Sequence, residues 1–189
     1  MRKVVIDSII SLDGYFTSLN NEIDWFSFNM EEITWSKEIL RRADTMLYGS
    51  VTYQEFSQFW PNAKPTSDGF DSEIIDQLNG YNKIVFSGRD IKTTWGPVEV
   101  VHGDPVETIK EMKIKRGKDM VVVGSGTLVS SLVRNDLVDE YRIRIRPIIL
   151  GSGRPLFHDE IRRHKLNLIS STAFENGVVA LHYEPDHFH

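Results

Sequence analysis

The sequence predicts a single α/β domain whose mostly parallel β-sheet is covered by helices and ends in an antiparallel hairpin. Short β-branched segments alternate with segments of helical periodicity over most of the chain, which is the pattern of strand–helix–strand units. Near the carboxyl end, Asn176-Gly177 separates two strand-like segments, and this dipeptide is a strong hairpin signal. The chain contains no repeat and no linker rich in proline and glycine, so we expect residues 1–189 to form one domain.

Local composition predicts the elements in order along the chain. Short apolar or β-branched runs predict strands at residues 4–10, 45–48, 83–86, 98–101, 120–123, 166–170 and 178–183. Apolar residues at helical spacing, or a cap before them, predict helices at 31–42, from Ser50 or Thr52, from Asp104-Pro105 and at 127–134. Thr52 with Glu55, and Asp104 with Glu107, have the spacing of capping boxes.

One further strand, at residues 141–146, alternates apolar residues with arginines. The arginines are Arg142, Arg144 and Arg146. Such alternation is typical of a strand with one solvated face, so we expect this strand near the edge of the sheet. A dimer contact or an anion site is the alternative role for the arginine face.

Composition excludes several classes of function. The 22 basic and 27 acidic residues give a net charge of −5, which argues against a nucleic acid or an anionic membrane as the main partner. It still permits an anionic small molecule, because backbone dipoles can bind phosphate on an acidic protein. The absence of cysteine excludes disulfides, thiolate nucleophiles and cysteine-ligated metals. No apolar run approaches the roughly 18 residues of a membrane helix, and no cleavage-type segment stands at the amino end, so a cytoplasmic location is expected.

The best candidate for a binding motif is the turn Gly124-Ser125-Gly126. It follows an all-apolar strand and leads into Thr127-Leu128 at the start of a helix. A dinucleotide phosphate requires backbone N–H donors without a Cβ in the way, and a helix start adds a favourable dipole. The Rossmann pattern would place a third glycine where Val129 stands, so a plain strand-to-helix turn without a ligand is the alternative.

Two other turns at strand ends have similar chemistry. Gly49-Ser50-Val51-Thr52 combines a glycine with hydroxyl side chains at a helix start, and Ser87-Gly88-Arg89 adds a guanidinium that can pair with phosphate. Each turn alone is typical of ordinary loop chemistry. Three of them at the carboxyl ends of strands indicate a ligand site, because open α/β sheets bind ligands there.

The candidate proton donors are Asp13, Glu31 and Glu32. A reductase requires a proton source beside the hydride acceptor, and a partly buried carboxylic acid can serve. Dipole compensation at a helix start is the alternative for the two glutamates. Nearby aromatic residues could form a wall for a flat ring or belong to the core: Trp25, Phe26, Phe28 and Trp35. No metal site is expected at the carboxyl end, where His182, Asp186, His187 and His189 lack a rigid element and supporting partners.

Six motifs in order resemble the dihydrofolate-reductase-like superfamily, and within it the reductase domain of bifunctional riboflavin-biosynthesis deaminase–reductases. They are Ser11-Leu12-Asp13-Gly14, residues 47–53, residues 84–87, residues 123–128, residues 137–140 and residues 147–153. The resemblance covers essentially the whole chain. It implies a three-layer α/β/α fold with a mixed, mostly parallel eight-stranded sheet, and a homodimer.

The resemblance also implies a cofactor, NADPH, lying across the strand ends; NADH is not excluded. Residues Gly124, Ser125, Gly126, Thr127 and Leu128 would hold its pyrophosphate, and Gly49, Ser50, Val51 and Thr52 would contact its phosphates. Ser87, Gly88 and Arg89 would flank the adenosine. Residues 11–15 would lie beside the nicotinamide, and the helix with Glu31, Glu32 and Trp35 would line the substrate pocket.

Three departures from the family pattern affect the expected activity. Ser50 stands where relatives commonly have an arginine that contacts the 2′-phosphate, Val123 where the riboflavin-pathway enzymes have a glutamate, and residues 54–57 replace an Asp-Pro segment. A buried valine cannot hydrogen-bond a polar pyrimidine. The leading hypothesis is an NADPH-dependent reductase of a small heterocyclic substrate, with a proton from Glu32, Glu31 or water. The alternatives are a 5-amino-6-(5-phosphoribosylamino)uracil reductase of riboflavin biosynthesis and a non-catalytic nucleotide-binding sensor.

Overall fold

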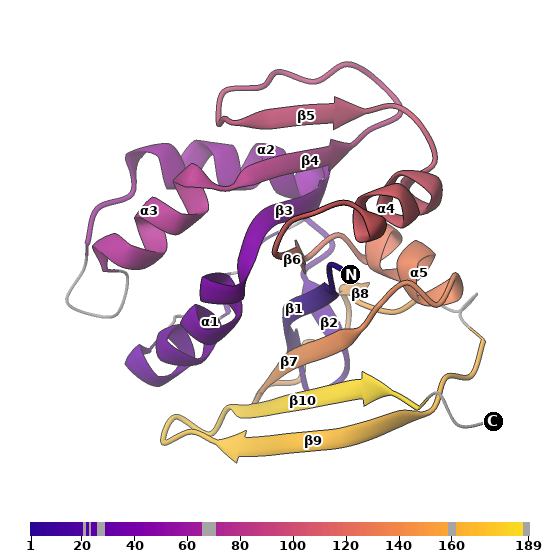
Figure 1. Cartoon of the computed structure of the whole chain (residues 1–189). Helices are drawn as coiled ribbons and strands as arrows, with labels where there is room; N and C mark the ends of the chain where they lie inside the picture. The colour runs from indigo at the N-terminus through magenta and orange to yellow at the C-terminus, as the bar shows by residue number, and fades with distance from the viewer. Residues whose placement is uncertain (21, 23, 26–28, 66–70, 159–161, 187–189) are drawn as a thin grey trace.

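The molecule is built on one eight-stranded sheet (Figure 1). The computed structural model describes residues 1–20, 22, 24–25, 29–65, 71–158 and 162–186. In spatial order the strands are β5 (Val98–Val101), β4 (Asn82–Phe86), β3 (Ala43–Gly49), β6 (Asp119–Val123), β1 (Val4–Ser11), β7 (Glu140–Arg146), β10 (Val179–Pro185) and β9 (Leu166–Ala173). The first six are parallel, whereas β10 is antiparallel to both of its neighbours. A small separate sheet pairs β2 (Tyr15–Thr17) with β8 (Arg154–Pro155).

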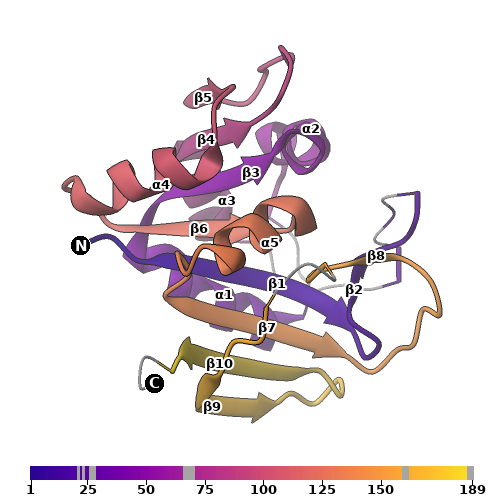
Figure 2. The same ribbon diagram turned by 90° about the vertical axis from the view of Figure 1, so that its right-hand side faces the viewer.

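Helices cover both faces of the sheet, which confirms the predicted three-layer α/β/α architecture (Figures 1 and 2). One face packs against α1 (Met30–Arg42), α2 (Ser50–Phe59), the short 3₁₀ helix η1 (Trp60–Asn62) and α3 (Ser72–Gly80). The other packs against α4 (Pro105–Ile114) and α5 (Gly126–Arg134). Strand β6 shows why both faces of the sheet need a covering layer. Successive side chains in a strand alternate, so the apolar Met120 and Val122 point to the α4–α5 side and Val121 points to the α1–α3 side. No helix in the described part of the chain is long and apolar enough to cross a membrane.

The prediction that the arginines of β7 face solvent near the sheet edge was wrong. Strand β7 is sixth of eight in the sheet. All three arginines are buried, because α1 covers that face of the strand, and side chains of α1 accept their hydrogen bonds. Arg142 donates to Glu38 at 3.1 Å, Arg144 to Ser36 at 2.6 Å and Arg146 to Glu32 at 2.7 Å. The Trp35 ring lies over Arg142, with 4.3 Å between the guanidinium carbon and the ring centroid.

The helices differ in how their amino ends are capped. Side chains of Asn29, Asp71 and Asp104 accept backbone N–H groups at the starts of α1, α3 and α4. The Asp104 cap was predicted, although Glu107 forms an ion pair with Lys110 at 2.9 Å. Helix α2 begins at Ser50, and its N-cap residue, Gly49, has no side chain to cap it, so the predicted capping box of Thr52 and Glu55 was wrong.

Candidate functional site

A cavity of about 1100 Å³ lies at the carboxyl ends of the parallel strands. It brings together turns that are far apart in the sequence, because parallel strands end at the same edge of a sheet. The predicted cofactor residues that line it are Gly49, Ser50, Val51, Thr52, Ser87, Gly88, Gly124, Ser125, Gly126, Thr127 and Leu128. Arg89 is not among the lining residues; its side chain is exposed, and its carbonyl accepts a hydrogen bond from the Ser87 hydroxyl at 2.6 Å.

Two helices point uncapped amino ends at this cavity. Helix α5 starts after Ser125 and α2 after Gly49, and neither N-cap residue makes a side-chain cap hydrogen bond. The first-turn N–H groups of a helix have no partner within the helix itself. Two such ends beside one cavity therefore offer backbone donors and positive dipole ends to an anion.

Close packing of the two turns requires glycine. A Cβ on Gly49 would lie 2.3 Å from the Ser125 Oγ, and one on Gly126 would lie 2.7 Å from the Pro155 carbonyl oxygen. Gly124 has φ +63° and Ser125 has φ +61°, in the left-handed region. A Cβ on Gly124 would meet Thr52 of the other turn at 3.4 Å, so glycine at positions 49 and 124 lets the two helix starts lie side by side at the cavity.

The three predicted proton donors are not among the residues that line the cavity. Asp13 accepts from the backbone N–H groups of Leu150 and Gly151 at 3.1 and 2.8 Å; a hydrogen bond from Ser11 and then these two backbone bonds lower its pKa. Glu32 is fully buried and bonded to Arg146 and Asn176. The exposed Glu31 accepts from the Glu175 backbone at 3.1 Å. Each carboxylate holds structural contacts, and its role as proton donor stays a prediction.

The predicted aromatic wall is made by other residues. Trp25 and Trp35 do not line the cavity, and Phe26 and Phe28 lie outside the described residues. The aromatic residues that do line it are Phe16, Phe56, Phe59, Trp60 and Phe86. They come from β2, α2, η1 and β4, so helical spacing in the sequence could not identify them as one surface.

Sequence reasoning missed Asp7 as a residue of the cavity, and it gave the arginine face that includes Arg144 an anion site only as an alternative role. Asp7 lies on β1 and accepts from Arg144 on β7 at 2.8 Å. The signal was available, because Asp7 and Ser8 interrupt an otherwise apolar run in a strand of a parallel sheet. A charge at such a position is retained only with a partner or a function.

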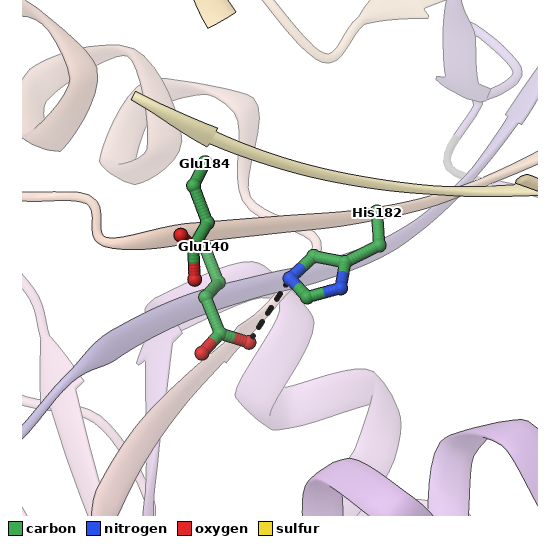
Figure 3. Close-up of side chains that lie close together, drawn as sticks. All are labelled: Glu140, His182 and Glu184. Carbon is green, nitrogen blue, oxygen red and sulfur yellow. Dashed lines mark ion pairs between the residues drawn. The ribbon is translucent and has the colours of Figure 1, made fainter. Parts of the chain in front are cut away.

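A second cluster, away from the cavity, joins Glu140, His182 and Glu184 (Figure 3). Two positively charged side chains already neutralise this cluster: Lys3 and Arg42 each donate to Glu140 at 2.8 Å. Burial raises the pKa of Glu140, but the bonds from Arg42 and Lys3 outweigh burial and hold that pKa at about 2. Burial and Arg142 lower the pKa of His182. Of the other terminal residues named above, Asp186 bonds through its backbone to Lys165, and His187 and His189 lie outside the described residues.

This cluster predicts a pH dependence of stability. The folded-state pKa of Glu140 lies below its ordinary value of 4.5, so its stabilisation is present above pH 4.5 and is lost as the pH falls toward 2. We expect Glu140→Gln to lower the free energy of unfolding by about 3 kcal/mol at pH 7 and by progressively less below pH 4.5. Urea unfolding of both proteins between pH 3 and 7 measures this. Glu184→Gln is the control, since its contact with Lys3 is 3.5 Å long and solvated; a pH-independent effect of Glu140→Gln would contradict the prediction.

Solved structures with a similar arrangement of strands and helices identify the fold of the protein. It superimposes on a putative riboflavin biosynthesis protein from Shewanella sp. PV-4 with a TM-score of 0.76, at 22% identity over 99% of this chain and 100% of the other. RibD of Acinetobacter baumannii gives 0.72 at 18% identity, covering 98% of this chain and 58% of that one. Dihydrofolate reductase of Enterococcus faecalis, complexed with NADP(H), gives 0.63 at 10% identity over 97% of this chain and 96% of the enzyme. The chain therefore has the dihydrofolate-reductase-like fold.

Sequence comparison narrows the class to a family. Residues 2–180 match the family described as the RibD C-terminal domain. YyaP of Bacillus subtilis, itself uncharacterized, is 30% identical over 183 residues, which is 96% of this chain and 94% of YyaP. The chain belongs to the RibD C-terminal domain family.

Proposed function

We propose that the protein is an NADPH-dependent reductase of a small heterocyclic substrate, with NADH as the alternative cofactor. The observation that carries the proposal is the pair of uncapped helix starts, packed through glycines, at one edge of a large cavity. Membership of the RibD C-terminal domain family supports it. A pyrimidine reductase-like protein of Corynebacterium diphtheriae also has the same fold, with a TM-score of 0.68 at 17% identity over 99% of this chain and 93% of the other. When bound, the dihydronicotinamide of such a cofactor supplies a hydride.

Different residues of the cavity would bind different parts of this cofactor. The backbone of residues 124–128 would bind the pyrophosphate at the start of α5, and residues 49–52 would add N–H donors from α2. Ser87 and Gly88 lie at the end of β4 and would flank the adenosine. The exposed guanidinium of Arg89 next to them suits a 2′-phosphate, because arginine forms paired hydrogen bonds with phosphate oxygens.

Titration of the purified protein with NADPH and NADH tests the proposal. We expect saturable binding of NADPH, followed by quenching of tryptophan fluorescence or by calorimetry. Arg89→Ala should weaken NADPH more than NADH, because only NADPH carries the 2′-phosphate. Absence of binding at millimolar NADPH by a folded protein would refute the proposal.

Two alternatives share this fold. For the riboflavin-pathway uracil reductase, rescue of a bacterial strain lacking that reductase is the test; the apolar Val123 in the cavity wall speaks against it. For a non-catalytic sensor, the placement of Asp13, Glu31 and Glu32 outside the cavity is the favouring observation. Tight NADPH binding without oxidation across a broad panel of heterocycles and carbonyl compounds would support the sensor.

We also propose that the protein is a homodimer. Strand β9 is the outermost strand of the sheet, and all eight of its residues are exposed. They include Leu166, Leu168 and Ile169. An exposed apolar edge strand is a common site of association, and light scattering at micromolar concentration measures the mass directly.

A further inference from the structure

One end of the cavity carries a polar pair that the proposed cofactor site does not use. The residues proposed for the cofactor follow β4, β3 and β6, which are neighbours in the sheet. The next two strands, β1 and β7, contribute Asp7 and Arg144 to the same cavity. Asp7 lies level with Val123, the last residue of β6. The pair is therefore adjacent to the glycine turn, on the side away from the residues proposed for adenosine.

The pair is buried and only partly satisfied. Asp7 is 6% and Arg144 4% exposed. Asp7 Oδ1 accepts from Arg144 Nη2 at 2.8 Å, and Arg144 Nη1 donates to the Ser36 hydroxyl of α1 at 2.6 Å. Within the described part of the chain, no donor reaches Asp7 Oδ2. The neighbouring Ser8 hydroxyl lines the same cavity, is 4% exposed, and has no hydrogen-bond partner among the described residues.

The buried polar groups without a hydrogen-bond partner indicate which kind of ligand the cavity favours. Buried polar atoms are almost always hydrogen-bonded, so an open carboxylate oxygen and an open hydroxyl favour a polar ligand. Burial raises the pKa of Asp7 while Arg144 and Arg142 oppose the rise, and an N–H donor from a ligand would stabilise the carboxylate further. A ligand carboxylate would instead face the open oxygen of Asp7 and be repelled. The Arg144 guanidinium retains further N–H hydrogens for an acceptor.

We propose that Asp7 and Arg144 determine the substrate specificity of this cavity by binding a neutral planar ring through a lactam edge, an N–H donor next to a C=O acceptor. The N–H donates to Asp7 Oδ2, and the carbonyl accepts from the Arg144 guanidinium. The assignment of this edge to a substrate rests on the reductase function proposed above. The preference of Asp7 and Arg144 for a lactam edge does not depend on that function.

Three small probes test the preference without any cofactor: 2-pyridone, N-methyl-2-pyridone and benzoate, titrated by ligand-observed NMR. We expect wild-type protein to bind 2-pyridone about tenfold or more tightly than either other probe, because hydrogen bonds to charged groups are the stronger ones. Asp7→Asn should lose that preference, since the amide can place an N–H where the lactam N–H would donate. Asp139→Asn, at an ion-paired aspartate that directly precedes β7 and accepts from the Val4 backbone N–H at the start of β1, should keep it.

Each outcome decides the matter. Equal binding of the three probes by wild-type protein, an unchanged preference in Asp7→Asn, or no binding of 2-pyridone at tens of millimolar overturns the proposal. If Asp7→Asn does not fold, Asp7→Leu with Arg144→Met replaces the buried pair by apolar side chains, and a lactam preference in that double variant overturns it as well. Parallel titration with NADPH separates the two proposals: lactam selectivity without NADPH binding refutes the reductase function alone, and NADPH binding without lactam selectivity refutes this inference alone.

Discussion

Gly49→Ala is expected to weaken NADPH binding about 5- to 150-fold, the range that overpacking of about 1–3 kcal/mol gives when it is expressed in binding. The new Cβ would lie 2.3 Å from the Ser125 Oγ and 3.1 Å from its Cβ. Because Ser125 is the N-cap residue of α5, relief of the clash moves the backbone that we propose to hold the pyrophosphate. Calorimetric titration with NADPH measures the loss.

A second substitution tests whether the clash is the cause. Ser125→Gly removes both of the atoms that the Gly49→Ala methyl group would meet, and glycine accepts the φ of +61° at this position without strain. The double variant should therefore recover most of the affinity that Gly49→Ala loses. Gly80→Ala, at the end of α3, is the matched control, because a Cβ there meets nothing within 4 Å. A double variant that binds as weakly as Gly49→Ala would show that the contact between the turns is not what limits binding.

The sequence predicted the framework well because strands, turns and hairpins leave local signals. The apolar run from Met120 to Val123 indicated a strand buried on both faces, and β6 lies in the middle of the parallel part of the sheet. Asn176-Gly177 correctly placed the hairpin between β9 and β10. The Gly124-Ser125-Gly126 turn was placed between a buried strand and a helix, as the structure has it.

The errors arose where one element decides the environment of another. Alternation in β7 shows that one face is polar, but it cannot distinguish water from a helix that supplies carboxylates and hydroxyls. Glu32 and Ser36 are four residues apart in α1, so they lie on one helix face, and they bind Arg146 and Arg144 respectively. That match becomes visible only when β7 is known to lie under α1. The pairing of Asp7 with Arg144 could not be predicted for the same reason, since the two residues are 137 positions apart, although the charge of Asp7 in a strand-like run was itself visible in the sequence.

Glu32→Leu is expected to lower the free energy of unfolding by about 3–5 kcal/mol, the cost of removing one member of a buried ion pair. Glu32 is fully buried and accepts from Arg146 at 2.7 Å and from Asn176 at 2.9 Å. Arg146 is only 7% exposed, so water does not readily replace the lost carboxylate. Urea unfolding followed by circular dichroism measures the change. Glu31→Leu, one residue away and exposed, should cost below about 1 kcal/mol.

The double variant Glu32→Leu with Arg146→Met separates a structural role from a catalytic one. Replacement of a whole buried ion pair by apolar side chains is often neutral for stability, so we expect most of the loss in Glu32→Leu to be recovered. If Glu32 acts only through Arg146 and the hairpin turn, the double variant also keeps its affinity for NADPH and any turnover the parent shows. If Glu32 supplies the proton, stability returns but turnover does not. A double variant as unstable as Glu32→Leu would show instead that the bond to Asn176, rather than the ion pair, is what Glu32 contributes to the fold.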